Sequence, residues 1–266
     1  MISNWLRAPL NQEQIISLLG DSYWRVSLFE SIPSTQIQLV KQVEMLKAEK
    51  LPAGTVLIAD HQSAGRGRLT RTFETPPQVA VLLSTVLYPI RNSADLGWIP
   101  LIVGVAAANA ISKYCGLAPL LKWPNDLLIG DLKVGGIIAE QVDDCVVIGI
   151  GINVLQNNDE LPAPTATSLF LECAKDEMKA REELIACLLQ EIRIEFDAWN
   201  KDKDNIEILK KYSKLSTTIG KRIKLDFQNG ESKESTAIGI AENGGLLISS
   251  GETIVSADLT HLRAIQ

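Results

Sequence analysis

The amino-acid sequence predicts an α+β protein in which helices pack on a β-sheet and a small all-β domain follows. Over residues 1–214, apolar runs that are typical of buried strands are interspersed with helical patterns. Beyond residue 214, short runs in which apolar and polar residues alternate prevail. Asn229-Gly230 and Asn243-Gly244 lie between these runs as hairpin turns. We therefore predict a first domain at residues 1–214 and a β-domain at residues 215–266, which is a workable size for an appended module.

Helices are predicted where apolar residues recur at spacings of three and four. The segment Arg181–Asn200 carries the clearest apolar stripe, and Ile99–Cys115 is rich in small residues, with Pro100 suited to its first turn. Gln12–Leu19 predicts a short helix, and Ser34 is expected to cap the N-terminus of another one. These helices are expected to pack on the sheet.

Strands are predicted from Val-, Ile- and Leu-rich runs between turn residues. In the first domain they are Thr55–Ala59, Val79–Tyr88, Leu120–Trp123, Leu127–Ile129, Ile137–Val142 and Val146–Asn153. In the second domain they are Arg222–Phe227, Ser235–Ile240, Leu246–Ile248 and Thr253–Val255. Residues 155–167, which contain two asparagines and two prolines, are expected to form a loop.

Composition and charge narrow the possible classes of function. The net charge of −6 does not favour nucleic acid as a partner, so any bound anion must be held by locally placed arginines and lysines. The four cysteines are scattered without a C-x-x-C pair, which argues against a zinc site and favours buried thiols in a reducing compartment. No signal-peptide pattern is present, and the longest apolar stretch, Trp98–Ile111, is too short to span a bilayer. We therefore predict a cytoplasmic protein.

The loop Gln62–Arg68, with Arg71 shortly after it, directly follows a predicted buried strand. Its glycines let backbone N–H groups approach an anion, and its arginines offer planar donors suited to phosphate or carboxylate. The loop lacks both the Walker A pattern and the glycine spacing of a Rossmann fingerprint. On composition alone, a polyphosphate cradle and a solvent-exposed turn are about equally favoured.

Three further segments combine polar groups with turns or glycines. Lys122–Asp126 can present a carboxylate near a lysine, which suits Mg²⁺, and Lys133–Gly136 places a lysine just before two glycines. Gly149–Asn153 is a core strand interrupted by glycines, which often marks the close approach of a ligand or another backbone. The structural alternatives are an Asx turn, an exposed hairpin lysine and close strand packing, and each is at least as well favoured when its segment is taken alone. A plain helix cap is likewise favoured for Ser34 and Thr35.

Taken together, in this order and spacing, the four segments resemble the motifs of the biotin protein ligases. That family carries a G-R-G-R-x-G-R loop, a K-W-P-N-D segment, a K-x-x-G segment and a glycine-rich G-x-G-I-N strand. In this chain the corresponding segments are Gly65–Arg71, Lys122–Asp126, Lys133–Gly136 and Gly149–Asn153. The resemblance covers residues 26–160 by motif, and a set of four ordered matches is highly specific.

Two features distinguish this chain from the usual pattern of the family that it resembles. Thr70 stands where the family usually has a glycine in the second half of the loop, and a β-branched residue is strained where φ is positive, so we expect the loop to follow a different path there. The larger family members begin with a DNA-binding helix-turn-helix domain. Only about 25 residues precede the catalytic pattern here, so the chain resembles the short, monofunctional type.

The resemblance implies a fold and a reaction. The fold is a class II synthetase-like catalytic domain, with a mixed β-sheet and packed helices, followed by a small SH3-like β-barrel. In the implied reaction the biotin carboxylate attacks the α-phosphate of ATP, with Mg²⁺, to give biotinyl-5′-AMP and pyrophosphate. A lysine of the biotin carboxyl carrier protein of acetyl-CoA carboxylase then attacks the mixed anhydride.

The resemblance also implies roles for individual residues. Lys133 would bridge the biotin carboxylate and the α-phosphate, and Arg68 would help the loop to close over the adenylate, so these two are the implied catalytic residues. The implied biotin-binding residues are Ser34, Thr35, Gln62, Gly65, Arg66, Arg68, Lys133 and Gly136. The implied nucleotide-binding residues are Arg66, Arg68, Arg71, Asn125, Asp126, Lys133 and Asn153, with Asp126 also as the Mg²⁺ ligand.

Three alternatives remain at this point. A lipoate or octanoate protein ligase shares the fold type and the lysine acceptor, although the arginine loop with Lys-Trp-Pro-Asn-Asp favours biotin. A non-catalytic, biotin-responsive regulator would need a DNA-binding element, and the sequence predicts none. An unrelated α/β domain would require four ordered matches by chance. The implied partners are biotin, ATP and the carrier protein, without nucleic acid or membrane, and a homodimer is compatible with the resemblance because some members dimerise.

Overall fold

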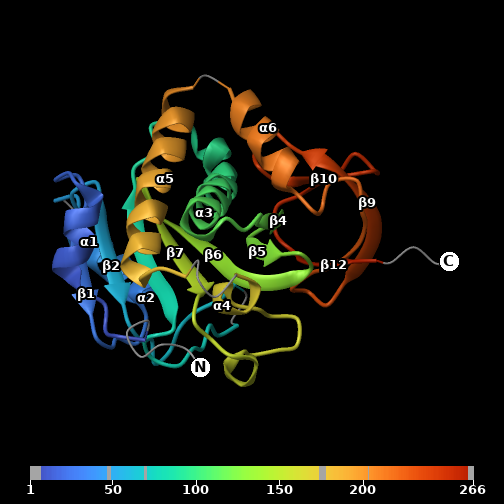
Figure 1. Cartoon of the computed structure of the whole chain (residues 1–266). Coiled ribbons are helices and arrows are strands. Elements are labelled where there is room, and N and C mark those ends of the chain that lie inside the picture. Colours follow the sequence, from blue (N-terminus) through green and yellow to red (C-terminus); the bar gives the residue numbers. More distant parts are fainter. Residues whose placement is uncertain (1–6, 47–48, 69–70, 174–177, 203, 263–266) are drawn as a thin grey trace.

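The computed structural model describes residues 7–46, 49–68, 71–173, 178–202 and 204–262, which form two β-sheets with helices packed on them (Figure 1). The larger sheet has seven strands in the order β1-β2-β3-β7-β6-β5-β4. Its strands are β1 (Arg25–Phe29), β2 (Thr55–Ala59), β3 (Ala80–Leu87), β4 (Leu120–Lys122), β5 (Asp126–Ile129), β6 (Leu132–Val142) and β7 (Cys145–Asn153). β1 and β2 run parallel and the other neighbouring pairs run antiparallel, so the expected mixed sheet is confirmed.

Helices cover both faces of this sheet. The longer ones are α1 (Gln12–Leu19), α2 (Thr35–Leu46), α3 (Ile99–Cys115), α5 (Arg181–Lys201) and α6 (Ile206–Leu215). Shorter turns in the connections are η1 (Ser93–Trp98), η2 (Asn158–Glu160) and α4 (Leu169–Glu172). The predicted bounds of α1 and α3 are confirmed, and α2 begins directly after Ser34, whose hydroxyl accepts a hydrogen bond from the Ile37 N–H at 3.4 Å.

Alternation along the strands decides which face of the sheet each side chain covers. In β7, Ile150 and its even-numbered neighbours enter the larger core with α1, α3 and α5. Val147 points to the opposite face, where it packs with Leu39 of α2 in a separate, smaller cluster. Gly149 and Gly151 are odd-numbered like Val147, so strand alternation places them on the same face. The two glycines of the predicted motif therefore lie on the face that α2 covers.

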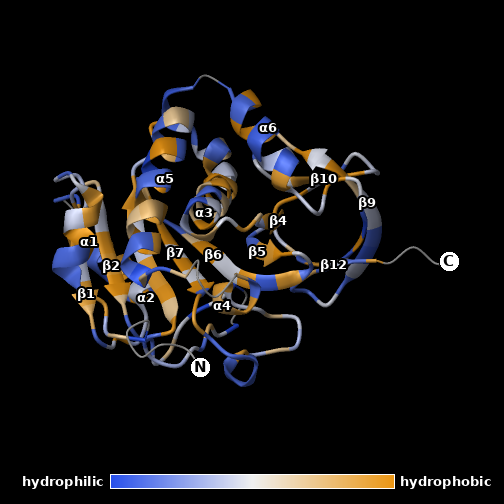
Figure 2. Cartoon of the chain, viewed as in Figure 1, coloured by the Kyte–Doolittle hydropathy of each residue, from blue (hydrophilic) through white to orange (hydrophobic). Residues whose placement is uncertain are grey.

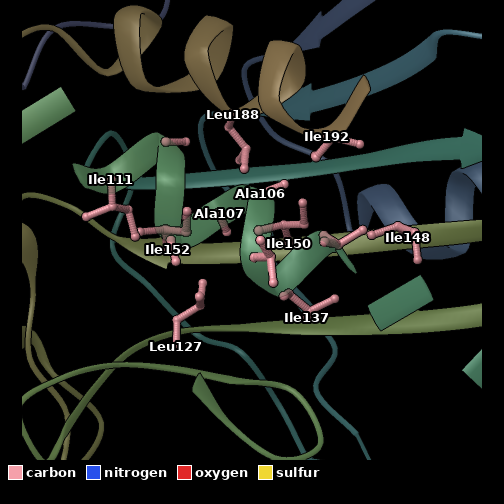
Figure 3. Close-up of a cluster of buried hydrophobic side chains, with 14 of the residues drawn as sticks. Ala106, Ala107, Ile111, Leu127, Ile137, Ile148, Ile150, Ile152, Leu188 and Ile192 are labelled. Carbon is pink, nitrogen blue, oxygen red and sulfur yellow. The ribbon is translucent and has the colours of Figure 1, made fainter. Parts of the chain in front are cut away.

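The larger core forms between the sheet and the pair α3 and α5 (Figure 3). Its labelled members include Ala106, Ala107 and Ile111 of α3, Ile148, Ile150 and Ile152 of β7, and Leu188 and Ile192 of α5. In Figure 2 orange dominates β1, β2 and β7 of the larger sheet, whereas α1, α5 and α6 carry both orange and blue, as amphipathic helices on a buried core do.

The prediction that the apolar stretch is too short to span a bilayer is wrong as to length, because η1 and α3 form a continuous segment, Ser93–Cys115, that is long and apolar enough to cross a membrane. Its most apolar window is 67% buried inside the protein, between the sheet and α5. The small side chains of Ala106, Ala107 and Ala110 have no exposed surface. The prediction of a tightly packed core helix is therefore confirmed, and close packing accounts for the apolar composition of this helix.

The smaller sheet contains the C-terminal strands in the order β11-β10-β9-β8-β12. Its members are β8 (Arg222–Asp226), β9 (Ser232–Ile240), β10 (Leu246–Ile248), β11 (Thr253–Ile254) and β12 (Asp258–His261), and neighbouring strands are antiparallel. Gly230 and Gly244 adopt φ values of 85° and 80° in the turns that flank β9, which confirms both hairpins. The expected small β-region at the C-terminus is thus present.

The two sheets are joined by specific contacts. The indole N–H of Trp98 donates to the Glu242 carbonyl at 2.7 Å, and the Trp123 backbone N–H donates to the Thr218 hydroxyl at 3.1 Å. Apolar residues from both sheets belong to one continuous core. The predicted boundary at residue 214 falls at the end of α6 and stays a prediction, because the core continues across it.

Among the described elements, β1, α4, α6 and β12 were not predicted, and neither were the short turns η1 and η2. β1 and β12 both lie at sheet edges. β12 contains one apolar residue, Leu259, whereas β1 carries Val26, Leu28 and Phe29, so the sequence of β1 did hold a strand signal. α6 does carry a helical stripe, of which Ile208 and Tyr212 are buried, so its sequence signal was present and was overlooked. β6 begins at Leu132 rather than at the predicted Ile137, which places Lys133 within a strand and not in an exposed hairpin turn.

Candidate active site

A cavity of about 390 Å³ lies on the face of the larger sheet that α2 covers. Its floor is formed by Ser84 of β3, Gly136 of β6, and Gly149 and Gly151 of β7. The sheet register places these residues side by side, because Ser84 pairs with Gly149 and Gly151 pairs with Gly136. The same strands carry large apolar side chains on their opposite face, so the small residues hollow out only the face toward α2.

Hydroxyl and amide groups line the end of the cavity at the N-terminus of α2. The side-chain oxygen of Gln62 accepts hydrogen bonds from the Thr35 backbone N–H at 2.7 Å and from the Thr35 hydroxyl at 3.0 Å. The hydroxyls of Thr35 and Ser84 lie 2.9 Å apart, and both residues are buried, as is Ser34. The structure therefore joins the predicted residues Thr35 and Gln62 with Ser84 in one network of hydrogen bonds, and the buried Ser34 lies beside it at the cavity.

The aromatic ring of Phe73 packs onto Gly151 of β7. A Cβ atom at Gly151 would lie 2.7 Å from ring atoms of Phe73, which is closer than real Cβ contacts come. A Cβ atom at Gly65 would lie 2.2 Å from the Phe73 carbonyl oxygen. These two glycines thus let the loop after β2 fold down onto the sheet and bring Phe73 into the cavity wall.

Lys133 of β6 lies at the charged end of the cavity. Its ammonium nitrogen is 2.5 Å from a carboxylate oxygen of Asp126, the residue that begins β5. Its backbone N–H donates to the Thr165 carbonyl, and its carbonyl accepts from the Thr167 N–H, both at 2.8 Å. The side-chain N–H of Asn125 donates to the Ile137 carbonyl at 2.9 Å. The position of the Lys133 side chain is thus fixed by Asp126, and its backbone by the segment that follows β7.

The arginine loop, defined as Gly65–Arg68 together with Arg71, lies at the rim of the cavity, and its two described parts are hydrogen-bonded to each other. The Gly67 N–H donates to the Arg71 carbonyl at 2.7 Å, and Arg66 forms an antiparallel bridge with Thr72. Thr70 lies outside the described residues, so the different path that we expect at this position stays a prediction.

The side chains of the arginine loop reach the C-terminal sheet. A guanidinium N–H of Arg68 donates to the Ser256 hydroxyl at 2.9 Å, and Arg71 forms an ion pair with Asp258 of β12. Burial lowers the pKa of Arg68 from its usual value, because a desolvated guanidinium lacks part of its hydration. An anion in the cavity would offset that loss, which is a physical reason for phosphate to bind beside Arg68.

Two of the predicted site residues do not line this cavity. Asn153 is buried at the end of β7, where its side-chain N–H donates to the Thr167 carbonyl and its oxygen accepts from Gln156, both at 3.0 Å. Asn153 therefore anchors the segment after β7. Gly65 lines a second cavity of about 900 Å³, which shares the rest of the arginine loop with the first cavity as part of its lining. The remaining predicted site residues line the first cavity, namely Ser34, Thr35, Gln62, Arg66, Arg68, Arg71, Asn125, Asp126, Lys133 and Gly136.

The structure also adds residues to the site that no motif indicated. Gln36 reaches from α2 to Glu140 of β6, and the distance between its side-chain N and the carboxylate is 3.0 Å. Ser84 had a detectable signal, because it interrupts an otherwise apolar strand with a hydroxyl. Phe73 and Asp258 had none, since each enters the site only through the folding of distant segments onto the sheet.

The side chains of the site can bind a metal ion that is also bound to a nucleotide, but they do not form a complete metal site of their own. Among the described residues, no group of three or more His, Cys, Asp or Glu side chains is placed to hold a metal ion. The cavity does contain carboxylates, including Asp126 and Asp258. Mg²⁺ is usually held by one or two carboxylates together with substrate phosphates and water, so these residues fit that ion when a nucleotide supplies the phosphates.

Comparison with known proteins identifies the family of the chain. A family model described as the biotin/lipoate A/B protein ligase family matches residues 28–153. A biotin–[acetyl-CoA-carboxylase] ligase of Mycobacterium tuberculosis is 31% identical, over 97% of this chain and 98% of that protein. A bifunctional ligase/repressor of Bacillus subtilis is 30% identical, over 82% of this chain and 70% of that protein.

Among solved structures, a biotin protein ligase from Aquifex aeolicus in complex with biotin and ATP superposes with a TM-score of 0.74. It is 28% identical, and the match covers 90% of this chain and 99% of that one. The larger mixed sheet and the small C-terminal β-region are thus shared with an enzyme of known activity. By its sequence and its fold, the chain belongs to the biotin/lipoate protein ligase family and, within it, to the biotin protein ligases.

Proposed function

We propose that the protein activates biotin with ATP to biotinyl-5′-AMP and then transfers biotin to a lysine of a biotin carboxyl carrier protein. The observation that carries this proposal is the polarity of one cavity. Neutral hydrogen-bonding groups gather at its Thr35 end, whereas Lys133 and the arginine loop gather at its other end. Biotin has the matching polarity, since it carries a neutral ureido group at one end and a carboxylate at the other.

The Thr35 end would hold the ureido ring. Gln62, Thr35 and Ser84 are already oriented by their mutual hydrogen bonds, so little side-chain freedom is lost when a ligand binds. Phe73 and the open floor at Gly149 and Gly151 offer apolar contact to the fused rings. A buried polar cluster of this kind disfavours a purely apolar acyl group, which is why we prefer biotin to lipoate or octanoate.

The charged end would promote the chemical step. A carboxylate that attacks a polyphosphate must overcome repulsion between two anions, so positioned cations lower the barrier. Lys133 would lie between the biotin carboxylate and the α-phosphate, and Arg66, Arg68 and Arg71 would contact phosphate oxygens. This mechanism needs no side-chain nucleophile, because the substrate carboxylate is itself the nucleophile.

Asp126 is the residue that we assign to Mg²⁺. Mg²⁺ held there with ATP would neutralise phosphate charge. The Lys133 ammonium, which pairs with Asp126, would contact the substrate carboxylate. Asn125 would contact the nucleotide together with Lys133, and Asn153 would support this part of the site through its bond to Thr167. ATP as co-substrate places the reaction in a compartment supplied with ATP, for which we propose the cytoplasm.

Biotin-dependent exchange between pyrophosphate and ATP tests the proposal directly. We expect the wild-type protein to catalyse exchange with biotin and not with lipoate, and the Lys133→Met variant to lose at least about a hundredfold in rate, as is typical when one donor to a developing anion is removed. Lys210→Met, which removes an exposed lysine of α6, is the matched control and should behave as wild type. Exchange by Lys133→Met within a few-fold of wild type would exclude Lys133 from the mechanism.

A further inference from the structure

Two Asn-Gly pairs lie in the turns of the C-terminal sheet, Asn229-Gly230 before β9 and Asn243-Gly244 after it. Glycine has no side chain to hinder attack by its own backbone nitrogen on the side chain of a preceding asparagine. In that reaction the nitrogen loses its proton and bonds to the asparagine Cγ, ammonia leaves, and a succinimide ring forms. Water then opens the ring to aspartate or isoaspartate. Each pair is therefore a candidate for spontaneous deamidation.

The two turns share one local geometry. The N–H of Gly230 donates to the Phe227 carbonyl at 3.0 Å. In the same way, the N–H of Gly244 donates to the Ala241 carbonyl at 2.9 Å. The side-chain oxygen of each asparagine accepts from the backbone N–H two residues further on, at 3.0 Å in both turns. A difference in reactivity between the two asparagines must therefore come from their surroundings.

The turn at Asn243 is enclosed by η1. A Cβ atom at Gly97 would lie 2.2 Å from the Asn243 carbonyl oxygen, and one at Gly244 would lie 2.4 Å from the Gly97 carbonyl carbon. Gly244 and Gly245 are both buried. The backbones of the turn and of η1 thus touch each other, so this turn cannot change its path without displacing η1.

The indole groups of two tryptophans bind the same turn. The indole N–H of Trp98 donates to the Glu242 carbonyl at 2.7 Å, and that of Trp123 donates to the Gly244 carbonyl at 3.5 Å. Trp123 belongs to the segment Lys122–Asp126, whose residues line the active-site cavity. A change in the backbone of this turn would therefore also disturb the active site.

The turn at Asn229 is open to solvent. Gln228, Asn229, Gly230 and Glu231 are all exposed, and a Cβ atom at Gly230 would meet nothing within 4 Å. The described hydrogen bonds of Asn229 and Gly230 run within the turn itself, so local opening is sufficient for the asparagine side chain to rotate toward the glycine nitrogen. Asn229 lines neither the active-site cavity nor the second cavity.

We propose that Asn229 is a site of spontaneous deamidation and that the contact of the other turn with η1 protects Asn243. The reaction replaces one amide by a carboxylate, so the net charge changes from −6 to −7. Its isoaspartate product adds one methylene group to the backbone. The exposed turn has room for this group, whereas the protected turn touches Gly97. The modified residue is also a substrate for enzymes that methylate isoaspartyl carboxylates.

Peptide mass spectrometry after incubation of the intact protein at mildly alkaline pH tests this assignment, since deprotonation of the glycine nitrogen speeds the reaction. Trypsin releases Asn229 in the peptide Leu225–Lys233 and Asn243 in the peptide that begins at Glu234. We expect the first peptide to deamidate at least about tenfold faster, which corresponds to about 1.4 kcal/mol in the free energy of local opening. Labelling by an isoaspartyl methyltransferase should be largely lost in Asn229→Gln.

Unfolding in urea separates the effect of structure from that of sequence, because both peptides should then deamidate at similar rates. Trp98→Phe, which removes the indole donor to Glu242, should speed the reaction at Asn243 and leave the rate at Asn229 unchanged. Equal rates at the two asparagines in the folded wild-type protein would refute the assignment. A persistent difference in urea would refute protection by the fold. These measurements require neither biotin nor ATP, so their outcome is separate from that of the proposed function.

Discussion

Two glycines of β7 shape the cavity because their neighbours occupy the space of a side chain. A Cβ atom at Gly149 would lie 2.7 Å from the side-chain oxygen of Gln36, and one at Gly151 would lie 2.7 Å from the Phe73 ring. Neither residue has a positive φ, so the requirement for glycine at these positions is steric and not conformational. The two glycines therefore allow α2 and the loop before β3 to approach the sheet closely.

We predict that Gly151→Ala weakens biotin binding about tenfold, because the added methyl group forces Phe73 away from the cavity wall, and overpacking of this kind costs about 1–3 kcal/mol. Isothermal titration calorimetry with biotin measures the effect. Gly239→Ala is the control, since a Cβ atom there meets nothing within 4 Å. An unchanged Kd in Gly151→Ala would show that the ring position does not matter for biotin.

At the scale of single elements, a buried ion pair ties α5 to the sheet. Arg181 at the start of α5 lies 2.8 Å from Asp60, at the end of β2, with side-chain exposures of 1% and 5%. Arg181 also donates to the carbonyls of Ala80 at 3.1 Å and Ala8 at 2.7 Å, and Asp60 accepts from the Leu10 N–H at 2.8 Å. One guanidinium group thus joins α5, β2, β3 and the N-terminal segment.

We predict that Arg181→Met lowers the free energy of unfolding by about 3–5 kcal/mol, because it leaves the Asp60 carboxylate buried without its partner. Urea denaturation followed by circular dichroism measures this loss. Arg193→Met on the same helix is the matched control, since the side chains of its pair with Asp21 are 36% and 49% exposed, and it should cost only about 1 kcal/mol. Equal losses for the two variants would contradict the role of burial.

At the scale of the whole molecule, the C-terminal sheet completes the site that the larger sheet begins. Arg68 contacts Ser256 across 188 residues of sequence, and Arg71 pairs with Asp258 across 187 residues. Both contacts hold the arginine loop against β12 and the strand connection before it. The smaller sheet therefore sets the position of a loop that the larger sheet carries.

We predict that Asp258→Asn frees the arginine loop without unfolding the protein. The Arg71–Asp258 pair is partly exposed, so its loss should change global stability by less than about 1 kcal/mol, whereas cleavage by trypsin after the loop arginines should become about fivefold faster. Timed digestion followed by mass spectrometry locates the cuts. Glu252→Gln, which breaks the exposed Lys233–Glu252 pair in the same sheet, should leave the digestion rate unchanged. Equal digestion rates for Asp258→Asn and wild type would show that Asp258 does not hold the arginine loop in place.

Features with a local physical cause were determined by the sequence itself. The apolar stripe of α5, the proline in the first turn of α3 and the Asn-Gly turns beside β9 depend on interactions within a few residues, and the structure confirms each of them. The four motifs were also recognisable, because their spacing is a property of the chain. Their convergence around one cavity agrees with the resemblance that the motifs implied.

Other features were decided only by the tertiary structure, because they depend on which distant segments meet. Register places Ser84 beside Gly149, and no local pattern fixes a register between strands so far apart in sequence. No local pattern predicts that Asp258 lies opposite Arg71. Nor does one predict that the side-chain amide of Asn153 bonds to Thr167 and Gln156 instead of lining the cavity. Periodicity and turn chemistry act over a few residues, whereas strand pairing and the docking of the second sheet result from the burial of one shared core.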